Sequence, residues 1–90
     1  QVVLVHRSRP TAEVYGTVRP AGAGRHVFLQ RRVGGSWKDV ASTVIRRQQL
    51  PDGVRTVGYV FDVEHRGRYR VRIPATPTLL EGRSRPVRIS

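Results

Sequence analysis

The sequence predicts an all-β fold, an antiparallel sandwich of two sheets, from three observations. First, residues 67–73 read Gly-Arg-Tyr-Arg-Val-Arg-Ile. A period of two places Tyr69, Val71 and Ile73 on one face of a strand and the arginines on the other. Second, no stretch of roughly 10–12 residues has the apolar spacing of a helix, and β-branched residues occur throughout. Third, Gly and Pro recur about every 8–15 residues, a spacing typical of the turns in a sandwich.

Length and composition indicate one small domain. The chain has 90 residues, of which 38% are hydrophobic, so we expect residues 1–90 to form a single domain around one core. It begins with Gln1 and has no methionine, and we therefore expect it to be a segment excised or processed from a larger protein. No run approaches the roughly 18 apolar residues of a spanning helix, so membrane insertion is not expected. The absence of cysteine excludes disulfides and thiolate chemistry.

The first half of the chain predicts four strands, at 2–6, 13–19, 25–33 and 36–45. The first is followed by Arg9-Pro10, and residues 20–24 predict a flexible turn. Alternation within 13–19 places Val14, Gly16 and Val18 on one face. Within 25–33 it separates Val27, Leu29 and Arg31 from Phe28, Gln30 and Arg32. Gly34-Gly35 predicts a tight turn, because both glycines can take a positive φ.

The second half predicts strands at 57–64, 67–73 and 83–90, with a loop at 74–82. Tyr59, Phe61 and Val63 are expected to point inward, as are Val87 and Ile89. The triplet Val-Arg-Ile, at 71–73 and 87–89, indicates two neighbouring strands with the same inward and outward requirement. Pro51-Asp52-Gly53 predicts a turn. Before it, either the fourth strand extends to Leu50 as a long hairpin, which is the favoured alternative, or residues 46–49 form a solvated loop.

An ordered set of short segments then points to a family. The segments are Gly16-Thr17-Val18-Arg19-Pro20, Val27-Phe28-Leu29-Gln30-Arg31-Arg32, Gly35-Ser36-Trp37-Lys38-Asp39-Val40, Gly58-Tyr59-Val60-Phe61, Gly67-Arg68-Tyr69-Arg70-Val71-Arg72 and Val87-Arg88-Ile89. Together they resemble the bacterial Ig-like β-sandwich domains attached to secreted and surface proteins of high-GC Gram-positive bacteria. The resemblance covers residues 13–90. Residues 46–56 are longer than the usual connection there, and the arginine content is higher than in typical members.

This resemblance implies a seven-stranded Ig-like or fibronectin-III-like antiparallel sandwich in an extracellular or cell-surface protein. It also implies a non-catalytic spacer, adhesion or ligand-binding unit beside other domains of the parent protein. A structural subdomain that completes a neighbouring enzyme domain is an alternative. The Gly67-x-Tyr69-x-Val71 motif resembles the tyrosine corner of Ig-like domains, where the tyrosine hydroxyl bonds back to the chain. Trp37 follows a hairpin turn, so we expect it to pack at one end of the core rather than form an exposed ligand platform.

The sequence predicts no catalytic, cofactor-binding or metal-binding residue, and no cofactor. His6, His26 and His65 lie far apart, and no serine occupies a nucleophile elbow. Asp62 and Glu64 point the same way on one strand, an arrangement that suits charge pairing with arginines, or calcium as the alternative. We therefore expect no enzyme activity.

The charge is the remaining functional signal. The formal net charge is +11, and all but one of the 17 basic residues are arginine. Codon bias of a GC-rich genome is one explanation. The other is a surface for polyanions, because arginine pairs bidentately with phosphate, sulfate and carboxylate.

In an Ig-like topology the third, sixth and seventh predicted strands share a sheet. Its outer face would carry Phe28, Gln30, Arg32, Arg68, Arg70, Arg72 and Arg88, and the other sheet would expose Tyr15, Thr17, Asp62 and Glu64. Five residues form the candidate polyanion site: Arg32, Arg68, Arg70, Arg72 and Arg88. The expected ligands are an anionic cell-wall polymer, an acidic glycan or, non-specifically, nucleic acid. Phe28 is the only aromatic residue in this predicted patch, which argues against stacking of bases.

Overall fold

The fold is described from a computed structural model, for residues 4–8, 11–75 and 82–89, with backbone alone at positions 7 and 8. These residues form strands and one short 3₁₀ turn, η1 (Pro20–Gly22). The strands are β1 (Leu4–Ser8), β2 (Thr11–Thr17), β3 (His26–Val33), β4 (Ser36–Val44), β5 (Arg46–Gln49), β6 (Arg55–Val63), β7 (Gly67–Ile73), β8 (Gly82–Arg83) and β9 (Val87–Ile89). Within these ranges no helix has the length and apolar character needed to cross a membrane.

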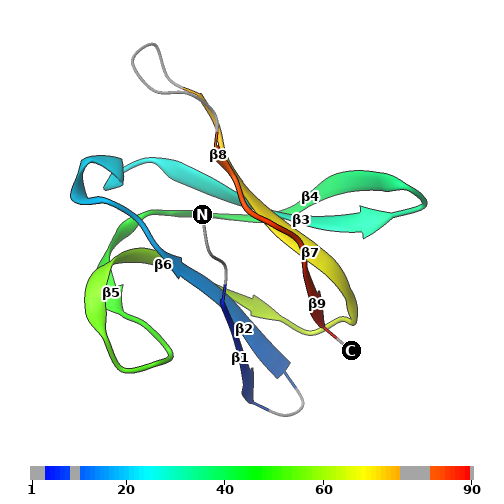
Figure 1. Cartoon of the computed structure of the whole chain (residues 1–90), viewed down its shortest axis with the longest axis horizontal. Helices are drawn as coiled ribbons and strands as arrows, with labels where there is room; N and C mark the ends of the chain where they lie inside the picture. Colours follow the sequence, from blue (N-terminus) through cyan, green and yellow to red (C-terminus); the bar gives the residue numbers. More distant parts are fainter. Residues whose placement is uncertain (1–3, 9–10, 76–81, 90) are drawn as a thin grey trace.

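Two antiparallel sheets form a sandwich, as predicted (Figure 1). The first sheet has the order β1-β2-β6-β5, and the second has the order β4-β3-β7-β8, with β9 also paired to β7. The third, sixth and seventh predicted strands therefore share the second sheet. The shortest dimension of the molecule is 17 Å, which suits two layers whose backbones lie about 10 Å apart.

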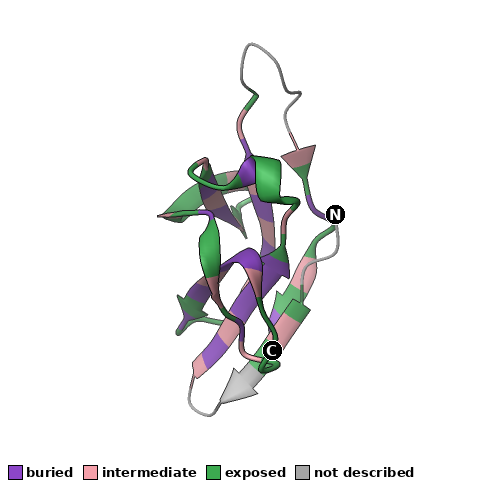
Figure 2. Ribbon diagram, turned by 90° about the vertical axis from the view of Figure 1, so that its left-hand side faces the viewer, coloured by how far each residue is buried: buried purple, intermediate pink, exposed green. Residues whose placement is uncertain are grey.

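The core lies between the sheets and follows the predicted alternation (Figure 2). Val14 and Val27 are fully buried, and Gly16 faces inward so closely that its Cβ position would lie 2.5 Å from the Tyr59 hydroxyl oxygen. The sequence pattern places six residues at the centre of the core, and all six are buried, namely Val27, Leu29, Tyr59, Phe61, Tyr69 and Val71. Burial of these side chains is the main source of stability in so small a domain.

The predicted tyrosine hydrogen bond is present at the crossover between the sheets. The Tyr69 hydroxyl donates to the carbonyl oxygen of His65 over 2.7 Å. The bond fixes the chain where it leaves β6 in the first sheet and enters β7 in the second. Because Tyr69, Val71 and Ile73 are buried, the arginines that alternate with them lie on the outer face of β7.

The turns follow their sequence signals in part. Gly34 and Gly35 have φ values of 58° and 83°, and Val33 pairs with Ser36 across them, as expected for a two-residue hairpin. Residues 20–24 form the predicted turn. Pro20 opens the 3₁₀ turn η1, in which the Ala23 amide donates to the Pro20 carbonyl over 3.1 Å.

Residues 46–56 form neither a continuation of the fourth strand nor a solvated loop. β4 ends at Val44 in the second sheet, and β5 pairs with β6 in the first sheet. Ile45 lies at the bend, where its side chain is fully buried. The favoured hairpin prediction is therefore correct about pairing around Pro51-Asp52-Gly53 but wrong about the sheet to which residues 46–49 belong.

Several predicted strands begin, end or divide differently from expectation: β1 extends to Ser8, and β6 begins at Arg55, two residues before the predicted strand. The ladder between β1 and β2 ends with the pair Ser8–Thr11. β2 therefore starts and ends two residues before the predicted strand. The predicted last strand, 83–90, divides into β8 and β9, because Pro86 has no amide to donate in a ladder. Between β8 and β9, the Ser84 hydroxyl oxygen accepts a hydrogen bond from the Val71 amide over 2.8 Å. Positions 2–3, 9–10, 76–81 and 90 of the expected strands and loops lie outside the described residues.

The expectation that Tyr15 would be exposed is wrong. Tyr15 is only 7% exposed, although it lies on the outer face of the first sheet. Its cross-strand neighbours are Leu4 and Val60, so apolar side chains flank the ring on both sides. Thr17, Asp62 and Glu64 are exposed on this sheet as predicted.

Candidate anion-binding face

The outer face of the second sheet gathers the arginines of several strands. Directly opposed residues in an antiparallel ladder share a face, and the register therefore defines what we call the arginine face. It comprises Phe28, Gln30, Arg32, Trp37, Asp39, Arg68, Arg70, Arg72, Arg83 and Arg88. All five arginines of the predicted site lie on it. They differ in how many contacts their guanidinium groups make with other side chains of the protein.

Arg70 is fixed by contacts with two other residues of the arginine face, Trp37 and Gln30. Its guanidinium lies over the Trp37 ring, with Cζ 4.4 Å from the ring centroid, and the Arg32 Cζ lies 5.7 Å from the same centroid. Arg70 Nε also donates to Gln30 Oε1 over 2.7 Å. Because Trp37 packs against arginines on the outer face, the expectation that it would cap the core is wrong.

Asp39 supplies the counter-charge for the central part of the face. Its Oδ1 accepts from Gln30 Nε2 over 2.9 Å, and its Oδ2 accepts from Arg72 Nη2 over 3.4 Å. Arg72 also lies over Phe28, with Cζ 4.8 Å from the ring centroid. Gln30 joins Arg70 to Asp39 and is only 7% exposed. Charge and ring contacts thus offset much of the repulsion among the central arginines.

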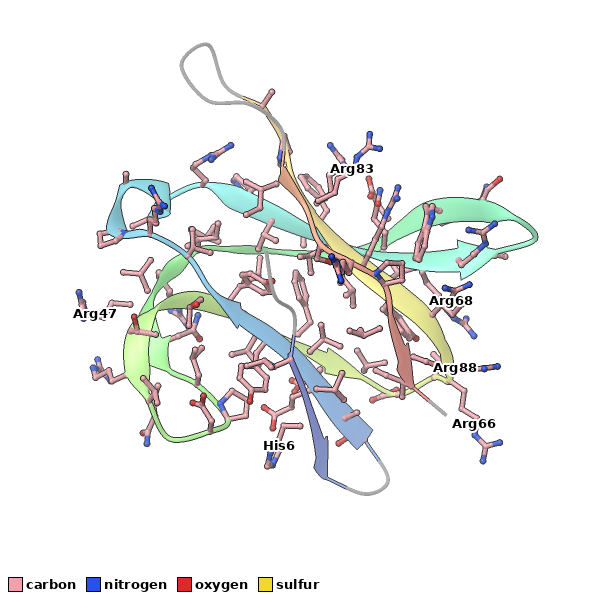
Figure 3. All side chains as sticks on the ribbon, in the orientation of Figure 1. His6, Arg47, Arg66, Arg68, Arg83 and Arg88 are labelled. Carbon is pink, nitrogen blue, oxygen red and sulfur yellow. The ribbon has the colours of Figure 1, made fainter. Side chains whose placement is uncertain are left out.

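Arg68 and Arg88 lie at the β9 end of the face and face each other directly across the ladder. Both are exposed, and among the described residues neither has an ion-pair partner. A hollow of about 570 Å³ is lined by these two arginines together with Arg66, Gly67 and Ile89. Figure 3 shows Arg66, Arg68 and Arg88 at the same end of the molecule, far from Arg47. This end of the arginine face thus brings together three arginines, Arg66, Arg68 and Arg88, that have no ion-pair partner among the described residues.

The outer face of the first sheet carries acidic residues together with Arg46. In the strand register, Glu13 lies opposite Asp62 on one side and opposite His6 on the other. Glu64 is exposed just beyond the end of β6. Asp62 and Glu64 thus lie on the opposite side of the sandwich from the arginine row, as the alternation predicted, and Glu13 lies beside Asp62. Within the described part of the chain no group of three or more potential ligands is placed to hold a metal ion.

Three members of the arginine face were not anticipated from the sequence: Trp37, Asp39 and Arg83. The two-residue Gly34-Gly35 turn was a usable signal for the first two, because it forces Trp37 opposite Arg32. Pro86 was a signal for Arg83, since a proline inside a presumed strand indicates a break. In β8, before that break, Arg83 lies opposite Arg72 on the outer face.

The aromatic rings of the face are already covered by guanidinium groups. Arg70 occupies one face of Trp37, and Arg72 lies over Phe28. Proteins that bind single-stranded nucleic acid without sequence preference present open rings on which bases stack. The arrangement here offers charge rather than open rings.

Two buried tyrosines have perturbed acidity, and both lie away from the arginine face. Burial raises the pKa of the Tyr59 hydroxyl far above its ordinary value. Its oxygen has no hydrogen-bond partner among the described residues. Burial also raises the pKa of Tyr69, and the nearby charge of Arg31 opposes the shift. Neither hydroxyl lines the hollow at Arg68 and Arg88.

Comparison with known proteins gives no match for this chain. No protein-family model matches it. No curated protein and no solved structure matches it significantly.

Proposed function

We propose that this chain is a non-catalytic, Ig-like accessory module of a larger secreted or cell-surface protein, and that its arginine face binds an anionic polymer. The polymer classes that fit are an anionic cell-wall polymer and an acidic glycan. Nucleic acid would bind through charge alone.

Strand order supports the Ig-like inference. In Ig-like constant domains the first, second, fifth and fourth strands form one sheet, and the third, sixth and seventh form the other. With β5 as the fourth strand and β8 with β9 as one interrupted strand, the described chain has this order, and β4 is an additional strand beside β3 in the second sheet. The bond from Tyr69 to His65 also resembles the tyrosine corner of that fold. The sequence resemblance to bacterial Ig-like domains agrees with both features.

The observation that carries the binding proposal is the charge balance of the arginine face. Among the described residues it holds a single carboxylate, Asp39, against Arg32, Arg68, Arg70, Arg72, Arg83 and Arg88. A surface of one sign attracts polyanions and releases their counterions on binding. A neutral spacer has no need for such a surface.

Strand geometry suits an extended ligand. Arg68, Arg70 and Arg72 occupy alternate positions of β7, so their Cα atoms are about 7 Å apart along the strand. An extended polymer with regularly repeated charges could meet several of them in succession. Arg32 and Arg88 lie on the strands at either side and widen the positive track.

Heparin chromatography tests the proposal with two variants of equal charge. R32S/R68S/R88S removes three exposed arginines of the face, and R46S/R47S/R55S removes three exposed arginines of β5 and β6. We expect the first variant to elute at markedly lower salt than the second, because only the first removes polymer contacts. Equal elution of the two variants would mean that net charge alone controls retention, and the proposal would fail.

A plain spacer is the competing function, and one observation favours it. Arg70 and Arg72 are engaged by Trp37, Gln30, Asp39 and Phe28 within the fold. Their conformations are explained without a ligand. A spacer would lose no partner binding in either triple variant.

A further inference from the structure

We propose that Arg66, Arg68 and Arg88 form a subsite for one tetrahedral oxoanion, a sulfate or phosphate monoester group of the bound polymer. The inference rests on the proposed function, because it names the chemical group that the arginine face recognises. It assigns that recognition to one end of the face. The rest of the face supplies the surrounding positive potential.

The first support is geometric. Arg68 and Arg88 are directly opposed in the ladder between β7 and β9, as are Gly67 and Ile89. Side chains opposed in this way start from Cβ atoms about 4.5–5.5 Å apart. Arg66 precedes β7 and lines the same hollow of about 570 Å³. Three guanidinium groups can therefore approach a single anion from three backbone positions (Figure 3).

A second pair of opposed arginines on the same sheet serves as an internal comparison. Arg72 lies opposite Arg83, and there Asp39 places a carboxylate oxygen 3.4 Å from Arg72. The pair Arg68–Arg88 has no such carboxylate among the described residues. Like charges directly opposite each other are destabilising in a sheet. An external anion would reduce the repulsion between Arg68 and Arg88, as the Asp39 carboxylate reduces the repulsion between Arg72 and Arg83.

The composition of the hollow favours a tetrahedral monoester over a carboxylate. Of the five described residues that line it, three are arginines and none is acidic. A sulfate or phosphate monoester presents three non-bridging oxygens, one for each guanidinium. A carboxylate presents two. Because charge-assisted hydrogen bonds are among the strongest polar contacts, the third oxygen should distinguish these groups.

NMR of the arginine side chains tests the subsite without any polymer. Sodium sulfate is titrated into the protein at constant ionic strength, balanced with sodium chloride. We expect the Nε–Hε signals of Arg66, Arg68 and Arg88 to follow one saturating curve. R68S/R88S should abolish that curve, and R46S/R47S should preserve it. Equal, non-saturating shifts at all exposed arginines would overturn the subsite.

Binding of three oligosaccharides of equal length and charge then identifies the source of the oxoanion. One carries sulfate monoesters, one phosphate monoesters, and one only carboxylates. We expect an ester to bind at least about tenfold more tightly than the carboxylate chain, a difference that one charge-assisted contact can supply. The tighter of the two esters is the source. R68S/R88S should remove the preference, and equal affinity of all three chains for the unaltered protein would overturn the proposal.

The two tests separate this inference from the proposed function. Saturation by sulfate at the three arginines without binding of any polymer would contradict the proposed function and support the subsite. Polymer binding that depends on Arg32 but not on Arg68 and Arg88 would support the proposed function and overturn the subsite.

Discussion

The Arg70 guanidinium lies over the indole of Trp37, with Cζ 4.4 Å from the ring centroid. The same side chain donates a hydrogen bond from Nε to Gln30 Oε1 over 2.7 Å. Gln30 in turn donates to Asp39. Arg70 therefore has two roles: its contacts stabilise the arginine face, and its charge adds to the positive potential of that face. Mutation can separate the two roles.

Arg70→Met should destabilise the domain by about 1–2 kcal/mol. The variant loses the contact with the indole, worth about 0.5–1 kcal/mol at exposed sites, and leaves the buried Gln30 oxygen without its donor. Chemical denaturation followed by tryptophan fluorescence measures the change. Arg68→Met is the matched control, and it should cause no loss, because Arg68 faces only another arginine in the ladder. Equal destabilisation by both variants would contradict this account.

The two buried tyrosine hydroxyls should respond in opposite directions. Tyr69→Phe removes the bond to the His65 carbonyl and should cost about 1–2 kcal/mol of unfolding free energy. Tyr59→Phe removes a buried hydroxyl without a partner in the described structure, and it should leave stability unchanged or raise it by up to about 1 kcal/mol. Thermal and urea denaturation compare the two. A larger loss in Tyr59→Phe than in Tyr69→Phe would show that the hydrogen bonds are misassigned.

Stability should fall as the pH rises above about 10. Burial raises the pKa of Tyr59 and of Tyr69 above the ordinary 10.0, so the unfolded chain releases these protons first. Above pH 10 the unfolded state then binds fewer protons than the folded state, and the free energy of unfolding decreases with pH. Urea denaturation from pH 8 to pH 12 measures the slope. Tyr59→Phe should flatten it, whereas an unchanged slope in that variant would contradict the role of Tyr59.

Asp39→Asn should strengthen binding of anionic polymers while weakening the fold slightly. It removes the carboxylate that contacts Arg72 at 3.4 Å and increases the positive charge of the arginine face by one. Asp62→Asn changes the net charge equally but on the opposite sheet. We expect the affinity for heparin to rise more in Asp39→Asn, and log Kd to depend more steeply on log salt by up to about one counterion. Equal gains in the two variants would indicate a response to net charge alone.

Much of the fold follows from local pattern. Alternation over residues 67–73 and 57–63 was sufficient to place the core residues Tyr59, Phe61, Tyr69 and Val71, because a strand with one buried face leaves only one register. The Gly34-Gly35 hairpin was equally predictable, because few residue pairs tolerate two positive φ values. These features depend on neighbours in sequence.

Features that depend on distant pairing were not predictable in the same way. Whether residues 46–49 stay with β4 or join β6 is decided by packing around Ile45, which no local pattern encodes. Tyr15 has the alternation of an exposed residue, and it is buried because Leu4 and Val60 flank it across the sheet. The positions of the five predicted arginines followed from periodicity. Which of them contact other side chains among the described residues, and which do not, followed only from the side-chain contacts.

The most direct test of the central claim uses Trp37, the only tryptophan of the chain, as a reporter within the arginine face. Heparin is titrated into the protein at low salt while the tryptophan emission is recorded. If the polymer binds this face, the emission should change along a saturating curve, reverse on addition of salt, and respond alike in R46S/R47S/R55S. Retention on a heparin column without any change in Trp37 emission would place the polymer elsewhere and contradict the account.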